Sequence, residues 1–121
     1  MPSSGRQSVQ RRNWRMRIQD ILEGIAKIER YMDGKTFQDF VADTLLVDAV
    51  LRNLEVIGEA AGHVPEDRQT RHPEIPWYEI KGMRNLVAHE YFGVSLDIVW
   101  LTVHDDLGPI VPLLTRMLAE D

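Results

Sequence analysis

The chain has 121 residues, with 14 Lys and Arg against 19 Asp and Glu, and its formal net charge is -5. This length suits one domain that covers residues 1–121. The chain contains no cysteine, which excludes disulfides, thiolate nucleophiles and cysteine-bearing zinc sites. The acidic balance argues against broad, unspecific nucleic-acid binding, because that binding depends on basic side chains that neutralise phosphates. No segment reads as a signal peptide or a membrane span, so we expect a soluble, cytoplasmic protein.

Positive charge is concentrated at the start of the chain. Residues 1–17 contain no acidic residue. They contain five arginines, namely Arg6, Arg11, Arg12, Arg15 and Arg17. Residues 1–9 are expected to form a flexible basic N-terminus. This end could be a phosphate-seeking arm or the frayed, solvated first turn of a helix, and the second interpretation is favoured because Trp14 already belongs to an apolar stripe.

The first apolar stripe predicts a helix over about residues 10–32, because its apolar residues recur at steps of three and four. Gly34 can supply a left-handed cap after this helix. Thr36 and Asp39 then resemble a capping pair, which predicts a short helical turn over residues 37–41.

A second helix is expected after Asp43, which can cap its first turn, and it should end at Gly62. The next segment, residues 63–76, contains three prolines and many charges. It therefore predicts a connector with one helical turn after Pro65 and without a deep core.

A third helix should start after Pro76 and run to Gly93. Its inward-facing residues should be Trp77, Ile80, Met83 and Val87, which follow at steps of three and four. Gly82 lies inside this helix, where glycine costs about 1 kcal/mol relative to alanine. That cost suggests that the backbone of another element approaches closely at Gly82.

Ser95 is predicted to cap a fourth helix. Pro109 and Pro112 fit the start of a short fifth helix near residue 108, because the first four N–H groups of a helix have no internal partners. Nothing in the chain reads as a strand or a repeat. The sequence thus predicts an all-α bundle of four main helices plus short helical pieces.

Three of the four histidines are not interpreted as functional. His63 and His72 lie in the polar connector and are expected at the surface. His104 precedes Asp105 and Asp106, but adjacent residues on a helix point in different directions, so solvent-exposed capping groups are favoured over a cation site. Motifs for phosphate loops, zinc proteases and serine nucleophiles are absent from the sequence. We expect neither a metal site nor a cofactor.

The fourth histidine lies in the segment RNLVAHEY, residues 84–91. Asn85 and His89 are four residues apart and share a helix face, whereas Arg84 and His89 are about 140 degrees apart around an ideal helix. A site that uses both therefore favours two chains that meet across a two-fold axis. In the structural alternative, Arg84 pairs with a carboxylate, Asn85 and His89 form hydrogen bonds along the helix, and Tyr91 packs its ring.

The stretch from Ile25 to Leu107, and above all HPEIPWYEIKGMRNLVAHEYFGVSLDIVW, resembles the HepT-like branch of the HEPN superfamily. This branch consists of small helical toxins found beside minimal nucleotidyltransferase (MntA-type) antitoxins. HEPN ribonucleases are similar in carrying an arginine, a polar residue and a later histidine, which are here Arg84, Asn85 and His89. The extension to Tyr91 is typical of the HepT branch, and the segments ERYMDG and VDAVLRNLEVIGEAA agree with it.

The resemblance implies an HEPN-type bundle that dimerises through the motif helix and forms a metal-independent endoribonuclease site between two copies. In such a site Arg84 would bind phosphate, His89 would transfer protons, and Asn85 would orient the His89 ring or bind the substrate. The resemblance also implies the toxin component of a type II toxin–antitoxin system. Its nucleotidyltransferase partner would transfer AMP to Tyr91 and thereby block the cleft.

A competing interpretation is a non-catalytic helical module that binds a nucleotidyltransferase partner or a nucleotide. The intact motif favours the ribonuclease, whereas the acidic balance does not help RNA binding. Arg52, Asn53 and Glu59 are polar residues on the largely apolar second helix, and they either support a dimer cleft or face solvent. Exposure to solvent is the favoured interpretation for Arg52.

Overall fold

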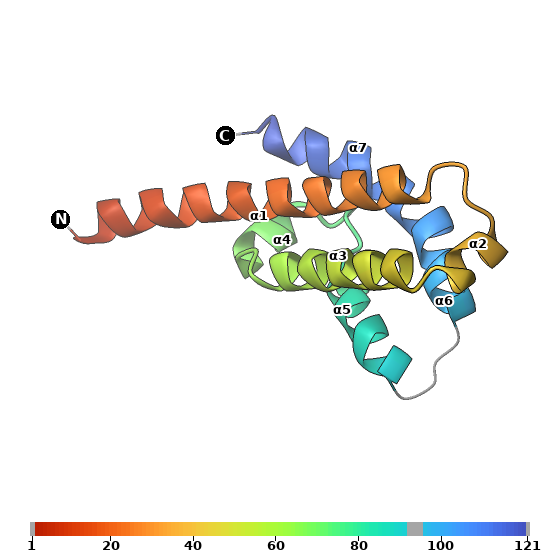
Figure 1. The fold of residues 1–121 in the computed structure, drawn as a ribbon. Coiled ribbons are helices and arrows are strands. Elements are labelled where there is room, and N and C mark those ends of the chain that lie inside the picture. Colours follow the sequence, from red (N-terminus) through yellow and green to blue (C-terminus); the bar gives the residue numbers. More distant parts are fainter. Residues whose placement is uncertain (1, 92–95, 121) are drawn as a thin grey trace.

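The computed structural model describes the backbone of residues 2–91 and 96–120, and the side chains of residues 14–86 and 96–120. Within these ranges every regular element is a helix, which confirms the predicted all-α fold (Figure 1). The elements are α1 (Pro2–Met32), α2 (Phe37–Ala42), α3 (Thr44–Gly62), α4 (Glu66–Arg71), α5 (Trp77–Tyr91), α6 (Leu96–Leu101), a π-helix (Thr102–Asp106) and α7 (Leu107–Leu118).

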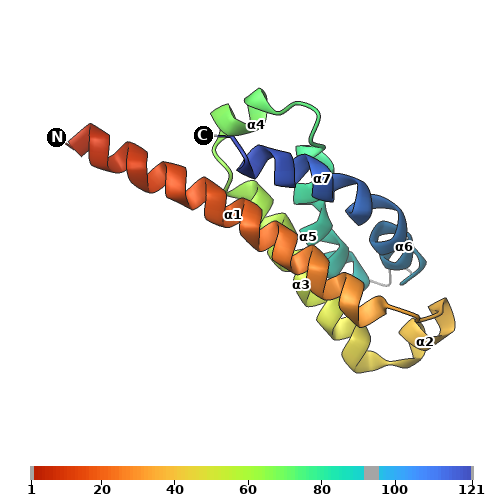
Figure 2. The same ribbon diagram turned by 90° about the horizontal axis from the view of Figure 1, so that it is seen from above.

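The longest helix, α1, contributes one side of the core through residues from Trp14 to Met32, which include the fully buried Ile18 and Ile21. It begins at Pro2, earlier than the expected start near residue 10. The N-terminal part extends beyond the other helices (Figures 1 and 2). The apolar periodicity did not indicate this extension, because residues before Trp14 carry no apolar stripe for it to detect.

Arg15, one of the arginines near the N-terminus, has a structural role. Its Nη1 donates to the carbonyl oxygen of Leu118 at 2.7 Å, and its Nη2 donates to the carbonyl oxygen of Glu120. The guanidinium groups of Arg15 and Arg68 each lie 4.8 Å from the centre of the Trp14 ring. Arg15 thus binds the C-terminal end of α7, where a cation is favoured by the helix dipole.

The predicted caps around α2 and α3 are confirmed. The Thr36 hydroxyl accepts from the Asp39 backbone N–H, and the Asp39 carboxylate accepts from the Thr36 backbone N–H, both at 3.0 Å. This second bond lowers the pKa of the Asp39 carboxyl. Asp43 caps α3 by accepting from the backbone N–H of Leu46 at 3.1 Å. Gly34 adopts the expected left-handed conformation, with φ of 73°.

The central helix, α3, packs against α1 on one side and α5 on the other (Figure 2). Each contact is close at one glycine. A Cβ atom at Gly24 of α1 would lie 2.8 Å from the Ile57 side chain, and a Cβ at Gly58 would lie 2.7 Å from the Arg84 backbone nitrogen. The expectation of a close approach at Gly82 is wrong within the described chain, because a Cβ there would meet no atom within 4 Å.

The connector between α3 and α5 is more deeply buried than expected. Val64 and Ile75 join the core, and only 6% of the surface of His72 is exposed. The His72 ring nitrogens lie 3.3 Å from the Glu74 carboxylate and 3.1 Å from that of Glu120. The predicted surface position is therefore wrong for His72, which is held between the connector and the C-terminal segment. His63 is exposed, as expected.

The helical pieces after residue 95 follow one another without a break. The predicted short helix that starts near residue 108 is observed as α7, but it does not begin separately, because the π-helix Thr102–Asp106 runs directly into it. The chain axis bends between α6 and α7 (Figure 1). Pro109 and Pro112 each remove a backbone donor here, and a wider turn is one way in which a helix accommodates such a loss. None of the described helices is long and apolar enough to cross a membrane.

Candidate functional site

All four residues of the predicted motif belong to α5. The helix is continuous from Trp77 to Tyr91, so the spacing of an ideal helix applies to the whole segment. The side chains of Arg84 and Asn85 are exposed. The backbone positions of His89 and Tyr91 lie in the last turns of α5, but their side chains fall outside the described residues, as do Val87, Gly93 and Ser95.

Two faces of α5 have opposite characters. The face around Ile80 and Met83 is buried in the core. On the opposite face, Tyr78 is 85% exposed, Gly82 has open space in front of it, and Asn85 is exposed. With 3.6 residues per turn, position 89 falls on the same face as Asn85, whereas Arg84 lies toward α3. The helix therefore separates the arginine and histidine positions as the sequence indicated.

Arg84 lies against the C-terminal half of α3. Its Nη1 is 3.5 Å from Oε1 of Glu59, and the two side chains are 49% and 51% exposed. The same nitrogen would be 3.7 Å from a Cβ at Gly62. This ion pair agrees with one part of the structural alternative, in which Arg84 pairs with a carboxylate. From the sequence, Glu59 could either support a dimer cleft or face solvent; in the structure it pairs with Arg84.

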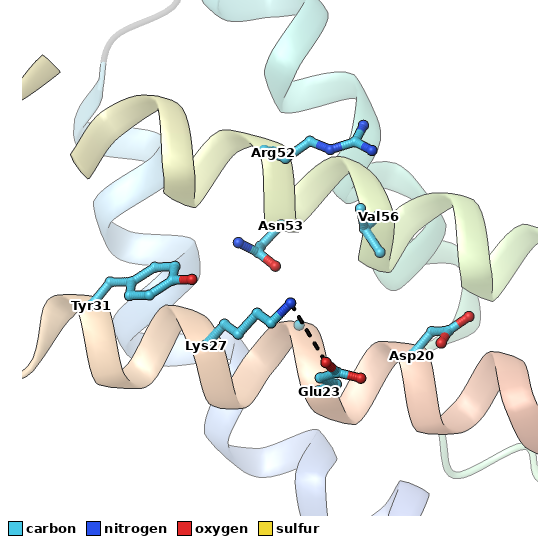
Figure 3. A pocket seen from close by; sticks show the side chains of 8 residues that line it. Asp20, Glu23, Lys27, Tyr31, Arg52, Asn53 and Val56 are labelled. Atoms are coloured by element: carbon cyan, nitrogen blue, oxygen red, sulfur yellow. Dashed lines mark ion pairs between the residues drawn. The ribbon is translucent and has the colours of Figure 1, made fainter. Parts of the chain in front are cut away.

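Arg52 and Asn53 of α3 border a shallow pocket between α1 and α3, with a volume of about 330 Å³ (Figure 3). Asn53 donates to the carbonyl oxygen of Ala49 at 2.8 Å. Arg52 lies 3.7 Å from Glu55, and its side chain is 71% exposed, which agrees with the favoured interpretation. Lys27 of this pocket forms an ion pair with Glu23 at 3.5 Å. The residues that line the pocket do not include the motif.

The remaining candidate for a cation site has no support among the described side chains. His104 packs against Trp100, with ring centres 4.0 Å apart. His104, Asp105 and Asp106 are all exposed. No cluster of three or more histidine, aspartate or glutamate side chains suitable for a metal occurs in residues 14–86 and 96–120.

Comparison with known proteins decides the family. A family model described as "Ribonuclease HepT-like" matches residues 21–117, which contain the whole motif segment and both helices that hold Arg84. The chain belongs to this family. Membership confirms the resemblance drawn from the sequence and the prediction of an endoribonuclease.

Two curated relatives cover most of the chain. A "Probable ribonuclease HepT" of Thermococcus cleftensis is 43% identical over 90 residues, which are 74% of this chain and 82% of the relative. A protein of Caldanaerobacter subterraneus subsp. tengcongensis with the name "Putative RNase" is 35% identical over 104 residues, or 86% and 93% of the two chains. No solved structure gives a significant match.

Proposed function

We propose that this HepT-like chain is the toxin component of a type II toxin–antitoxin system, and that it cleaves RNA without a metal at a site shared by two copies. The observation that carries the proposal is the exposure of Arg84 and Asn85 on a helix that continues through position 89, inside the region matched by the ribonuclease family. The open face of α5 around Tyr78 and Gly82 supports a dimer contact through this helix. A glycine without neighbours allows a second helix to approach closely.

The chemistry requires two proton transfers and one cation. The ribose 2'-hydroxyl gives up its proton and attacks the adjacent phosphorus, the bond from phosphorus to the 5'-oxygen breaks, and that oxygen takes up a proton. The products are a 2',3'-cyclic phosphate and a 5'-hydroxyl. Two copies of His89 would act as base and acid, because imidazole exchanges protons near neutral pH. Arg84 would stabilise the extra negative charge on the phosphate oxygens.

The charge of the chain limits how RNA is bound. A dimer would carry a net charge of -10, twice the -5 of each chain. Arg15, which lies near the basic N-terminus, is already committed to the end of α7. We therefore propose a short RNA footprint with few phosphate contacts, for which the affinity falls only gently as salt is raised.

Growth of cells that express the chain tests the toxin function. Expression of the wild-type chain without the neighbouring nucleotidyltransferase gene should arrest growth, whereas expression of His89→Ala to the same protein level should not. A wild-type chain that leaves growth unchanged, or a His89→Ala chain that arrests it equally, would contradict the proposal. A wild-type chain that leaves growth unchanged but binds the nucleotidyltransferase would instead favour the non-catalytic module.

Neutralisation is proposed to occur at Tyr91. The partner enzyme would transfer AMP from ATP to the phenolic oxygen and release pyrophosphate, which places a negative phosphodiester two residues from His89 and repels an RNA phosphate. Incubation with the nucleotidyltransferase and ATP should add one AMP to the peptide that contains Tyr91 and stop RNA cleavage. Tyr78→Phe is the control, since it removes an exposed phenol elsewhere on α5 and should be modified like the wild type. Retained cleavage after complete modification of Tyr91 would exclude this mechanism of neutralisation.

A further inference from the structure

Three residues in the last turns of α3 surround Arg84 of α5. Gly58 faces its backbone, Gly62 lies near its guanidinium, and Glu59 forms an ion pair with Nη1. We call Gly58, Glu59 and Gly62 the arginine cradle. Arg84 therefore does not lie free on the surface but is held by a neighbouring helix at both its backbone and its charged end.

Gly58 fixes the backbone of α5 at this point. A Cβ at Gly58 would lie 2.7 Å from the Arg84 nitrogen, 2.8 Å from the Arg84 Cβ and 3.0 Å from the Lys81 carbonyl oxygen. Only the absence of a side chain allows the two helices to come this close. The position of the Arg84 main chain is consequently set by direct contact with α3.

Glu59 fixes the other end of the side chain. The two charged groups are each about half exposed, and ion pairs of this kind contribute little to stability because water screens them. A large contribution to folding is therefore not expected from this pair. The ion pair instead restricts the geometry of Arg84, because a flexible arginine that is bound at Nη1 adopts fewer orientations.

The guanidinium keeps enough donors for a substrate. It has five N–H groups in one plane, and Glu59 Oε1 is within reach of one terminal nitrogen only. Since the side chain of Arg84 is 49% exposed, other N–H groups remain open to solvent. A phosphate can bind them while Glu59 stays in place, so the carboxylate can orient Arg84 throughout the reaction.

We propose that Glu59 is a positioning residue for the ribonuclease reaction, which aims Arg84 at the phosphate from within the arginine cradle. This inference rests on the proposed function and adds a residue outside the motif to it. Glu59 does not touch the substrate in this arrangement. It acts by limiting the orientations of Arg84 before the extra charge develops on the phosphate.

Kinetics of Glu59→Ala test the inference. Its kcat for RNA cleavage should fall roughly tenfold, because a freely rotating Arg84 is less often aligned, while KM should change little and the melting temperature should stay close to that of the wild type. Glu59→Gln keeps an oxygen that can accept from Nη1, and it should recover most of the lost kcat. A role in stability alone would instead lower the melting temperature.

Glu55→Ala is the matched control. Glu55 lies on the same helix, is paired with an arginine at 3.7 Å and is 44% exposed, and its removal changes the net charge by the same amount. It should retain wild-type kcat. A wild-type kcat in Glu59→Ala, or an equal loss in Glu55→Ala, would overturn the positioning role.

A second measurement separates this inference from the proposed function. In the NMR spectrum of the full-length chain, the Nε–H signal of Arg84, assigned with Arg84→Lys, should shift and sharpen in Glu59→Ala as the side chain gains mobility. If the wild type and every variant fail to cleave RNA, the ribonuclease proposal fails. The NMR signal still decides whether Glu59 orders Arg84. An unchanged signal in Glu59→Ala would overturn the ordering of Arg84 by Glu59.

Discussion

Replacing His89 by alanine should lower the rate of RNA cleavage by about 10²–10⁴-fold, the usual range for the loss of a general acid or base. If two copies of His89 share one cleft, the change removes both the proton acceptor for the 2'-hydroxyl and the proton donor for the 5'-oxygen. The measurement is the single-turnover cleavage rate of a labelled RNA at neutral pH in the presence of EDTA. Wild-type activity should persist under these conditions, since no step in the mechanism requires a metal.

His104→Ala is the control for this experiment. His104 is exposed and packs against Trp100 in a segment that follows α6, so its loss should leave the rate unchanged. Cleavage by purified His89→Ala at the wild-type rate, with contaminating nuclease excluded by a mock purification, would remove His89 from the mechanism. Complete loss of wild-type activity in EDTA would show that the proposed metal independence is wrong.

Replacing Gly58 by alanine should damage both the fold and the activity. The added methyl group would lie within 3.0 Å of three atoms of α5, two of them in the backbone, so one helix must move. Overpacking of this kind costs typically 1–3 kcal/mol in the free energy of unfolding. A shift of Arg84 by even 1 Å can lower the cleavage rate about 100-fold. Urea denaturation and cleavage rates, measured where the variant is fully folded, report the two effects separately.

Gly108→Ala provides the comparison. Gly108 lies in α7, and a Cβ there would meet no atom within 4 Å, so the added methyl group has room. Stability should rise by about 0.5–1 kcal/mol, because alanine loses less conformational entropy in a helix. If Gly58→Ala were as stable and as active as Gly108→Ala, the close contact between α3 and α5 would not position Arg84.

Local sequence signals predicted the helices and their caps well. The capping pair of Thr36 and Asp39 and the cap at Asp43 depend on residues three apart, and such contacts can be read directly from the sequence. The π-helix was missed, because the prolines at 109 and 112 fit a new helix start as well as a widened turn. The burial of His72 was missed because Glu120, at the far end of the chain, supplies one of its partners.

Within one chain, the close approach at a glycine occurs at Gly58, and the sequence had suggested Gly82. Gly82 was chosen because it interrupts a predicted helix, yet it lies on the exposed face of α5. Gly58 lies between the buried residues Ile57 and Ala61 in the apolar register of α3, and this position was the available signal for a close helix contact. The pairing of Arg84 with Glu59 joins two helices, so spacing along the chain could not reveal it. The motif residues themselves came from the family resemblance.

The shared site is the central claim, and its most direct test mixes wild-type chains with His89→Ala chains. Equal amounts are co-expressed with different affinity tags, and the presence of mixed dimers is verified by mass spectrometry before RNA cleavage is measured. If each site needs both copies of His89, only wild-type pairs are active, and random pairing leaves about one quarter of the wild-type rate per total protein. A rate of about one half, which is expected if each chain carries a complete site of its own, would contradict the account.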